Sequence, residues 1–163
     1  AGGIVAILET ATIENSKNTG NVIGSTNIGG IAGESKGTIT QCRNDGQVSK
    51  VVGVICKTVN LGGLVGKNGE AARLSNSKNY GNVNSETDTL VNLGGICGIL
   101  YNNSIVELCE NNGAISGSGK EIIPNEDTNT NCASCTSNNG GSASTDDFGQ
   151  LNIGIIYGKY QEI

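Results

Sequence analysis

One seven-residue phrase recurs along the chain and sets its spacing. It reads Asn-(Ile/Leu)-Gly-Gly-(Ile/Leu)-x-Gly and occurs at 27–33, 60–66 and 92–98. A degenerate copy stands at 152–158, and a copy without the leading Asn opens the chain. The first glycine of each glycine pair, or of its remnant, falls at 2, 29, 62, 94 and 154. Internal repetition with a period of about 30 residues restricts the chain to repeat architectures, in which each unit buries its apolar face against its neighbours.

Two further parts recur inside each unit. The first is a short apolar stretch, centred in turn on Ile13, Ile39, Leu74 and Val106. The second is a turn followed by another short stretch that begins in turn at Val22, Val48, Val83 and Ile115. A branched aliphatic residue flanked by polar ones is typical of a short strand with one inward face.

Strand, turn and strand repeated at this period predict an all-β fold, a parallel β-helix or β-solenoid. Equivalent residues of successive coils would then stack about 4.8 Å apart, the ordinary spacing of paired strands. A leucine-rich repeat would need a leucine consensus that is missing here, and a β-propeller would need longer strands and more aromatic residues.

The spacing predicts one domain over 1–163, with about four coils starting near 2, 29, 62 and 94 and a partial fifth starting near 154. The main differences in length fall at one corner of the coil. The largest of them, 116–150, is rich in Ser, Asn, Gly and Thr, and we expect it to leave the tube as an exposed loop.

Composition limits both the core and the chemistry. Aromatic residues make up 3% of the chain, so small branched side chains and the 26 glycines must fill the interior. The net charge of -5 argues against nucleic acid or an anionic membrane as the partner. The chain has no His, which removes Ser-His-Asp and Cys-His catalysis and the commonest metal ligand. We therefore expect no enzyme activity and no cofactor.

The repeat resembles a known family. The run Gly-Gly-Ile-Ala-Gly-x-x-x-Gly-Thr-Ile-x-x-Cys-x-Asn-x-Gly-x-Val at 29–48 is similar to the GLUG-type repeat of bacterial surface proteins, which include IgA-specific metallopeptidases and large adhesins. The resemblance covers 2–115, fades over 116–153 and returns at 154–158. It implies an extracellular or cell-surface, β-helical spacer or adhesive segment, and its motif holds no catalytic residues.

An asparagine stands at one position of each unit, with a glycine two residues later. We expect the asparagines to form a hydrogen-bonded ladder at a turn, where Asn and Gly both tolerate left-handed backbone. The glycine pairs indicate a tight corner without room for a Cβ, since no helix or P-loop lysine follows them to make a phosphate site. The residues of this turn ladder are Asn18, Asn44, Asn79, Asn111, Gly20, Gly46, Gly81 and Gly113.

Six cysteines carry the remaining chemistry. Cys42 and Cys109 share a column with Ser16 and Ser77, which predicts a small inward side chain and, for Cys42, a buried free thiol. A bridge between Cys97 and Cys109 across one coil stays open. Cys132 and Cys135 form a CxxC, for which a local disulfide that stiffens a loop is favoured over a redox pair or a metal site.

The charged residues indicate few sites. Glu14 and Glu107 share a column with Thr40 and Ser75 between them, so they do not converge as a polysaccharide-cleaving acid pair would. Weak Ca²⁺ binding or catalysis would need the acids of the variable corner, which are Glu86, Asp88, Asp127, Asp146 and Asp147. Lys17, Arg43 and Lys78 form a basic column expected to serve solubility. Asn102 heads a glycosylation sequon, relevant only in a eukaryotic source.

The function expected from these patterns is structural or adhesive: a β-solenoid module of a secreted or surface protein. Neither end of the repeat shows a cap, so we expect it to stack head to tail with copies of itself or to continue into flanking repeats. The main alternative is a module that binds carbohydrate or a host protein through its outer face or 116–150. A polysaccharide-active enzyme is a more distant alternative.

Overall fold

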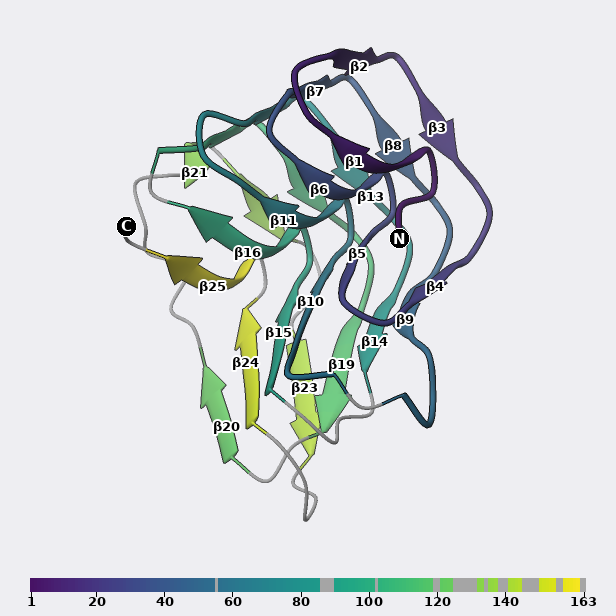
Figure 1. Ribbon diagram of the computed structural model, residues 1–163, viewed down its shortest axis with the longest axis vertical. Helices are drawn as coiled ribbons and strands as arrows, with labels where there is room; N and C mark the ends of the chain where they lie inside the picture. The colour runs from purple at the N-terminus through teal and green to yellow at the C-terminus, as the bar shows by residue number, and fades with distance from the viewer. Residues whose placement is uncertain are drawn as a thin grey trace.

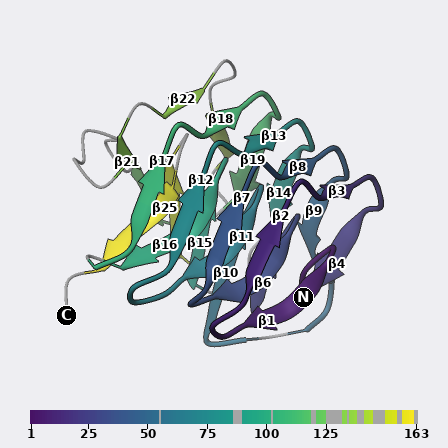
Figure 2. The same ribbon diagram turned by 90° about the horizontal axis from the view of Figure 1, so that it is seen from above.

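The computed structural model of the chain is a parallel β-solenoid, as the repeat predicts (Figure 1). It describes residues 1–54, 56–85, 90–101, 103–118, 121–124, 132–133, 135–137, 141–144, 150–154 and 157–161. Within those ranges no residue is helical, neighbouring strands of one sheet run parallel, and up to β19 they come from successive coils. Viewed from above, the coils follow one another from the N-terminal to the C-terminal side (Figure 2).

Five sheets, here called A to E, run along the solenoid. In spatial order, sheet A holds β5 (Asn27–Gly29), β10 (Thr58–Gly62), β15 (Leu90–Gly94), β24 (Gln150–Gly154) and β20 (Glu121–Pro124). Sheet B holds β1 (Val5–Leu8), β6 (Ala32–Ser35), β11 (Val65–Asn68), β16 (Cys97–Tyr101) and β25 (Tyr157–Gln161). Sheet C holds β2 (Thr12–Glu14), β7 (Thr38–Thr40), β12 (Arg73–Ser75), β17 (Ile105–Glu107) and β21 (Cys132–Ala133). Sheet D holds β3 (Lys17–Asn18), β8 (Arg43–Asn44), β13 (Lys78–Asn79), β18 (Glu110–Asn111) and β22 (Thr136–Ser137). Sheet E holds β4 (Val22–Gly24), β9 (Val48–Lys50), β14 (Val83–Ser85), β19 (Ile115–Ser118) and β23 (Gly141–Ser144).

The register of the sheets follows the columns read from the sequence. In sheet A, Asn60 pairs with Asn27 on one side and with Asn92 on the other, and Asn92 pairs with Asn152. Gly2 forms an isolated bridge to Gly29, so the copy of the phrase without its leading Asn also lies in register. The repeat thus fixes which residues stack, while the structure divides each coil into five short strands where the sequence indicates three recurring parts.

The interior of the tube is filled by two aliphatic clusters. One lies mainly behind sheets B and C and includes Ile39, Leu74 and Val106. The other lies behind sheets A and E and includes Val48, Val83 and Ile115. Both predicted aliphatic columns therefore face inward, and the small branched residues exclude water along the axis.

The segment 116–150 differs from the expectation of a loop outside the tube. Its described parts include β20, β21, β22 and β23, which extend sheets A, C, D and E. The physical reason is that the outermost coil offers unpaired backbone groups, and short polar stretches with little side-chain bulk can pair with them.

Sheet A also explains why the last copy of the phrase comes so late in the chain. The strand that pairs with β15 is β24, and β20 lies beyond it. β24 carries the phrase residues Asn152, Ile153 and Gly154, which align with Asn92, Leu93 and Gly94. The position beside β15 is thus occupied by the strand with the matching asparagine and glycine, and β20, which comes earlier in the chain, pairs on the far side of that strand.

Candidate functional site

The four predicted asparagines of sheet D come together as one ladder, here called the first ladder. Asn18 Nδ2 donates to Asn44 Oδ1 at 2.8 Å, Asn44 Nδ2 to Asn79 Oδ1 at 2.9 Å, and Asn79 Nδ2 to Asn111 Oδ1 at 2.8 Å. The last three of these side chains are fully buried. A buried amide is tolerated only when its donors and acceptors are paired, so the ladder meets that requirement along the axis.

Each amide also closes the turn that follows it. Asn44 Nδ2 donates to the Gly46 carbonyl at 2.7 Å, and the Gly46 amide donates back to Asn44 Oδ1 at 3.2 Å. Both donors of the Asn44 side chain are therefore used, and its oxygen accepts two hydrogen bonds. The glycines of the inner coils have no room for a side chain, since a Cβ on Gly81 would lie 1.9 Å from the Gly46 carbonyl oxygen.

The left-handed backbone lies elsewhere than predicted. The ladder asparagines belong to strands, and among the described glycines only Gly53 has a positive φ. A different column turns the corner between sheets C and D with φ between 49° and 53°, and it consists of Asn15, Gln41, Asn76 and Leu108. The next residue holds this corner, because Ser16, Cys42, Ser77 and Cys109 each donate a side-chain hydrogen bond to the carbonyl two residues earlier.

The glycine pair of the phrase makes room for the ladder. A Cβ on Gly30 would lie 2.2 Å from Asn44 Cγ, and one on Gly63 would lie 2.3 Å from Asn79 Nδ2. The ladder amides therefore reach across the interior and touch the opposite wall between the two aliphatic clusters. This contact agrees with the interpretation that the paired glycines leave no room for a Cβ.

A second ladder, in sheet A, was missed by the sequence analysis. It joins the asparagines that head the phrase: Asn60 Nδ2 donates to Asn27 Oδ1 at 2.7 Å, and Asn92 Nδ2 donates to Asn60 Oδ1 at 2.6 Å. Its donors point toward the N-terminal end, opposite to those of the first ladder. The recurrence of Asn at the head of each phrase was the available signal.

The outer faces carry ion pairs between neighbouring coils. Lys17 contacts Asp45 at 2.8 Å and Lys78 contacts Glu110 at 2.9 Å across coils, while Arg43 contacts Asp45 at 2.5 Å within one coil. The two cations hold the pKa of Asp45 below its ordinary value, through hydrogen bonds first from Arg43 and then from Lys17. The basic column expected to serve only solubility thus also links coils, although exposed pairs of this kind stabilise a fold weakly.

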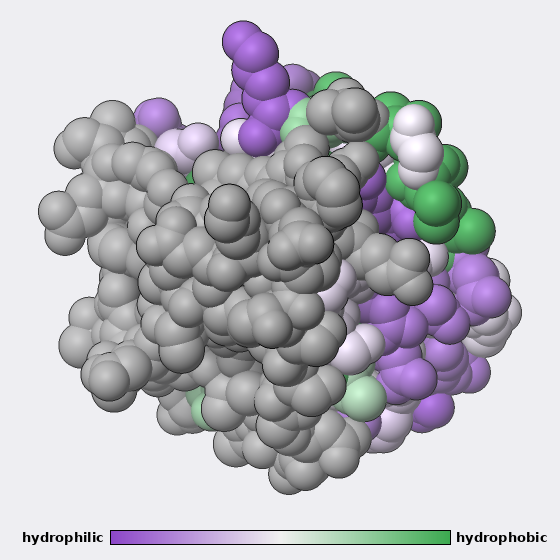
Figure 3. Space-filling view, turned by 90° about the horizontal axis from the view of Figure 1, so that it is seen from below, coloured by the Kyte–Doolittle hydropathy of each residue, from purple (hydrophilic) through white to green (hydrophobic). Residues whose placement is uncertain are grey.

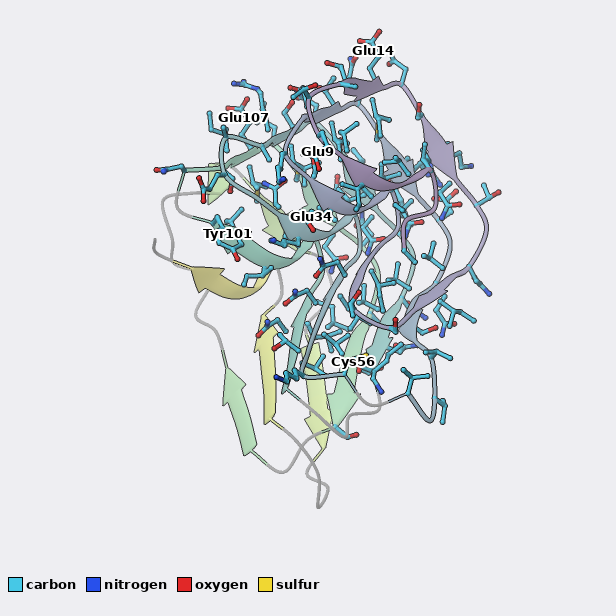
Figure 4. All side chains as sticks on the ribbon, viewed as in Figure 1. Glu9, Glu14, Glu34, Cys56, Tyr101 and Glu107 are labelled. Atoms are coloured by element: carbon cyan, nitrogen blue, oxygen red, sulfur yellow. The ribbon has the colours of Figure 1, made fainter. Side chains whose placement is uncertain are left out.

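The acidic residues form no converging pair in the described part. Glu14 and Glu107 point outward from different coils (Figure 4), and Thr40 and Ser75 separate them in register. No group of three His, Cys, Asp or Glu residues that could hold a metal ion occurs among the described residues. The acids of the variable corner, Glu86, Asp88, Asp127, Asp146 and Asp147, lie outside the described residues.

The cysteines with described side chains are mostly core residues. Cys42, Cys97 and Cys109 are buried free thiols, and Cys56 is a free thiol of intermediate burial. Burial raises the pKa of Cys109 to about 12 and raises that of Cys97 well above its ordinary value. Neither Cys97 nor Cys109 is bridged, so the open question of a disulfide across that coil is answered in favour of free thiols.

Two predicted sites cannot be placed. The side chain of Cys132 lies outside the described residues, so the disulfide with Cys135 stays a prediction. Cys135 itself packs against the aliphatic cluster behind sheets B and C. Asn102 also lies outside the described residues, and its glycosylation stays a prediction.

The first coil, residues 2–28, presents an open edge. The strands β1 to β5 each lie at the end of their sheet. Ile4 occupies the column of Ile31, Leu64 and Ile96, yet it is 42% exposed while the other three are fully buried. The described residues therefore place unpaired strand edges and core side chains at the same end of the solenoid.

One further apolar region is exposed. Val52 and Val54, between β9 and β10, are 82% and 41% exposed. In the view from below, apolar residues gather at one margin of the described surface beside hydrophilic ones (Figure 3). Among the described residues there is no helix of the length and apolarity that crossing a membrane requires.

Comparison with known proteins gives no relative. No protein-family model, no curated protein and no solved structure matches the chain. Functional inference therefore rests on the ladders, the outer faces and the open edge.

Proposed function

We propose that the chain is a structural β-solenoid module that continues end to end into a longer solenoid or fibre. The observation that supports this most is the edge of the first coil, where the strands β1 to β4 and the core residue Ile4 lie open together, while Ala1 to Gly3 pair along β5. Unpaired strand edges bind further strands readily, and an exposed core column adds apolar surface for a neighbouring coil to bury.

The mechanism is mechanical and requires no catalytic residue. Backbone hydrogen bonds link each coil to the next, the aliphatic clusters exclude water, and the two ladders keep every buried amide of their inner members paired. Such a module stabilises its neighbours by the interface that it shares with them. The proposal includes that this module belongs to a secreted or surface protein. That part rests only on the resemblance of 29–48 to the GLUG-type repeat.

The alternative of a carbohydrate-binding face has less support. Sugar recognition commonly uses exposed aromatic rings, and Tyr80, directly after β13, is 39% exposed. The Arg43 guanidinium lies 4.3 Å from the centre of that ring and covers it. On the described outer faces this ring therefore contacts a side chain of the neighbouring coil and does not present an open surface on which a sugar could stack.

An added coil tests the proposal. A second copy of residues 2–28 would be inserted before Gly2, so that the original first coil becomes an inner one. We expect the amide protons of Lys17 and Thr19 to gain protection from hydrogen exchange, because their counterparts Arg43 and Asp45 donate to carbonyls of the preceding coil. A flexible Gly/Ser extension of equal length is the control. Unchanged protection in the copy-bearing chain would count against continuation at this edge.

A further inference from the structure

The two ladders run in opposite directions, and this fixes what the open edge can bind. In the first ladder each Nδ2 donates to the asparagine of the following coil, from Asn18 to Asn44 and onward. In the second ladder each Nδ2 donates to the asparagine of the preceding coil, from Asn92 to Asn60 and from Asn60 to Asn27. Any coil placed before the first must therefore supply one amide donor and one amide acceptor at defined positions.

The first of these positions is at Asn18. The oxygens of Asn44 and Asn111 each accept two hydrogen bonds, one from the preceding asparagine and one from the glycine two residues later. Asn18 Oδ1 accepts only the bond from the Gly20 amide, at 3.1 Å, among the described residues. The buried Asn18 side chain thus keeps one acceptor site directed toward a preceding coil.

The second position is at Asn27. Its Oδ1 accepts from Asn60, while its Nδ2 donates to Glu34 Oε2 at 3.2 Å, on the neighbouring sheet. In the next coils the same Nδ2 reaches the oxygen of the preceding asparagine at 2.7 Å and 2.6 Å. Asn27 therefore holds an amide donor that serves the ladder in its counterparts Asn60 and Asn92.

The backbone repeats the same complementarity. The carbonyl of Ile31 accepts the amides of Ile4 and Val5 at 3.0 Å and 3.1 Å. The carbonyl of Leu64 accepts two amides from the second coil in the same way. Ile4 is the member of this column in the first coil, so its carbonyl is the position for two amides of a preceding coil.

The opposite edge of this chain does not match these positions. At the far end of sheet D, the residue opposite Asn111 is Ser137 in β22. At the far end of sheet A, the residue opposite Asn152 is Ile123 in β20. A second copy docked head to tail would bring Ser137 and Ile123 to the positions where the first coil requires two asparagine side chains.

We infer that the edge of the first coil binds a coil of its own repeat class that carries asparagine in both ladder columns, and not the C-terminal edge of another copy. The inference rests on the proposed end-to-end function and names the partner: a coil that donates an amide to Asn18 Oδ1 and accepts one from Asn27 Nδ2. Within the proposed function, it selects a longer solenoid of like repeats over a head-to-tail fibre of this chain.

The test uses the full chain with three N-terminal extensions. The first is the copy of residues 2–28, which brings its own Asn18 and Asn27. The second is the same copy with Asn18→Ala and Asn27→Ala within it, and the third is the same copy with Asn21→Ala within it. The exposed Asn21 side chain accepts the amide of Gln47 in the following coil, so its loss controls for the removal of an exposed asparagine contact across the same interface.

We expect the unaltered copy and the Asn21→Ala copy to slow exchange at the Lys17 and Thr19 amides about tenfold, and the double variant to lose most of that protection. Equal protection by the double variant would overturn the inference while leaving the proposed function intact. Absence of protection in all three extensions would overturn both.

Sedimentation of the unextended chain supplies the second measurement. We expect it to remain monomeric at concentrations up to about 100 μM, where contacts weaker than about 5 kcal/mol leave copies apart. Filaments that form by head-to-tail stacking would overturn the inference and support a fibre. Exchange at Lys17 and Thr19 in those filaments would show whether the first-coil edge is the one that is covered.

Discussion

The first coil and the inner coils contain the same residue types in the same columns but differ in environment. Ile4 is 42% exposed where Ile31 is fully buried. A Cβ on Gly20 would meet only the Asn18 side chain, at 3.7 Å, whereas one on Gly46 would lie 2.0 Å from the Gly20 carbonyl oxygen. This sequence position is therefore tightly constrained inside the solenoid and nearly free at its edge, because in this column the contact comes from the coil before it.

This difference shows where the stability of the repeat resides. Each unit buries little surface within itself, and its core columns and ladders gain their contacts across the interfaces between coils. In a solenoid the interface energy exceeds the stability of the isolated repeat, so an edge coil is the least stable part. Matched substitutions in the first and in an inner coil can measure that interface.

The largest expected difference is in the isoleucine column. Ile31→Ala should lower the free energy of unfolding by about 2–5 kcal/mol, since it removes a fully buried side chain and leaves a cavity. Ile4→Ala should cost only about 1 kcal/mol, because that side chain is already partly in water. Urea denaturation followed by circular dichroism measures both. Equal losses would mean that the first coil is covered in solution.

The ladder provides the next comparison. Asn79→Ala removes a fully buried amide and leaves Asn44 Nδ2 and Asn111 Oδ1 each without one partner, which should cost about 2–3 kcal/mol. Asn18→Ala disturbs a single neighbour and should cost about 1 kcal/mol. The same denaturation experiment measures both variants. A larger loss for Asn18→Ala would contradict the view that the ladder is strongest in its interior.

Much of this architecture can be predicted from the sequence, because equivalent residues of successive repeats stack on one another. Residues that share a column must fit the same environment, so the alignment of Ile13 with Ile39 or of Asn18 with Asn44 predicts the register directly. The glycine spacing likewise predicts which segment lies against which. A fold whose contacts join equivalent positions can be read from one sequence in this way.

Other features could not be read, and the reasons are local. The left-handed corner falls on Asn15, Gln41, Asn76 and Leu108, of which only two are asparagine, because the following Ser or Cys side chain holds that corner. The strands within 116–150 have no counterpart in the repeat, since they pair with whatever edge the last coil leaves. The polarity of the ladders depends on amide orientation, which composition and spacing do not encode.

A third prediction concerns a buried amide outside both ladders. Asn68 is fully buried, and neither its Nδ2 nor its Oδ1 has a hydrogen-bond partner among the described residues. Its column neighbours in sheet B are Ser35 and Leu100. Asn68→Leu should therefore raise the free energy of unfolding by about 1–2 kcal/mol, because it removes an unpaired polar group and adds an apolar one of similar size.

Asn79→Leu is the matched control for that variant. Both asparagines are fully buried, but Asn79 has its amide paired in the first ladder. The same change should destabilise at Asn79 and stabilise at Asn68. A loss of stability in Asn68→Leu, measured by the shift of the denaturation midpoint, would indicate that the Asn68 amide has a partner in solution, such as a buried water.

The smallest expected effect is on the pH dependence of stability, and it again compares positions near to and far from the open edge. Burial raises the pKa of Cys109 from 9.0 to about 12. The folded thiol thus stays protonated where the unfolded one ionises, and its contribution is complete below pH 9 and declines as the pH rises toward 12. Midway through that window each pH unit should remove about 1.4 kcal/mol of stability, and near either end of it about 1 kcal/mol. Cys42 occupies the same column one coil from the edge, and burial raises its pKa too, opposed by hydrogen bonding with the backbone of Ser16 and Thr40.

Serine variants separate the two thiols, since Ser16 and Ser77 already fill this column and donate the same hydrogen bond. Cys109→Ser should flatten the decline in stability between pH 9 and pH 10 by about 1 kcal/mol, and Cys42→Ser should flatten it by less. Chemical denaturation at the two pH values under reducing conditions measures both slopes. An equal effect of the two variants would mean that the second coil is as well shielded from water as the fourth, and therefore that the edge of the first coil admits less solvent than its exposed isoleucine indicates.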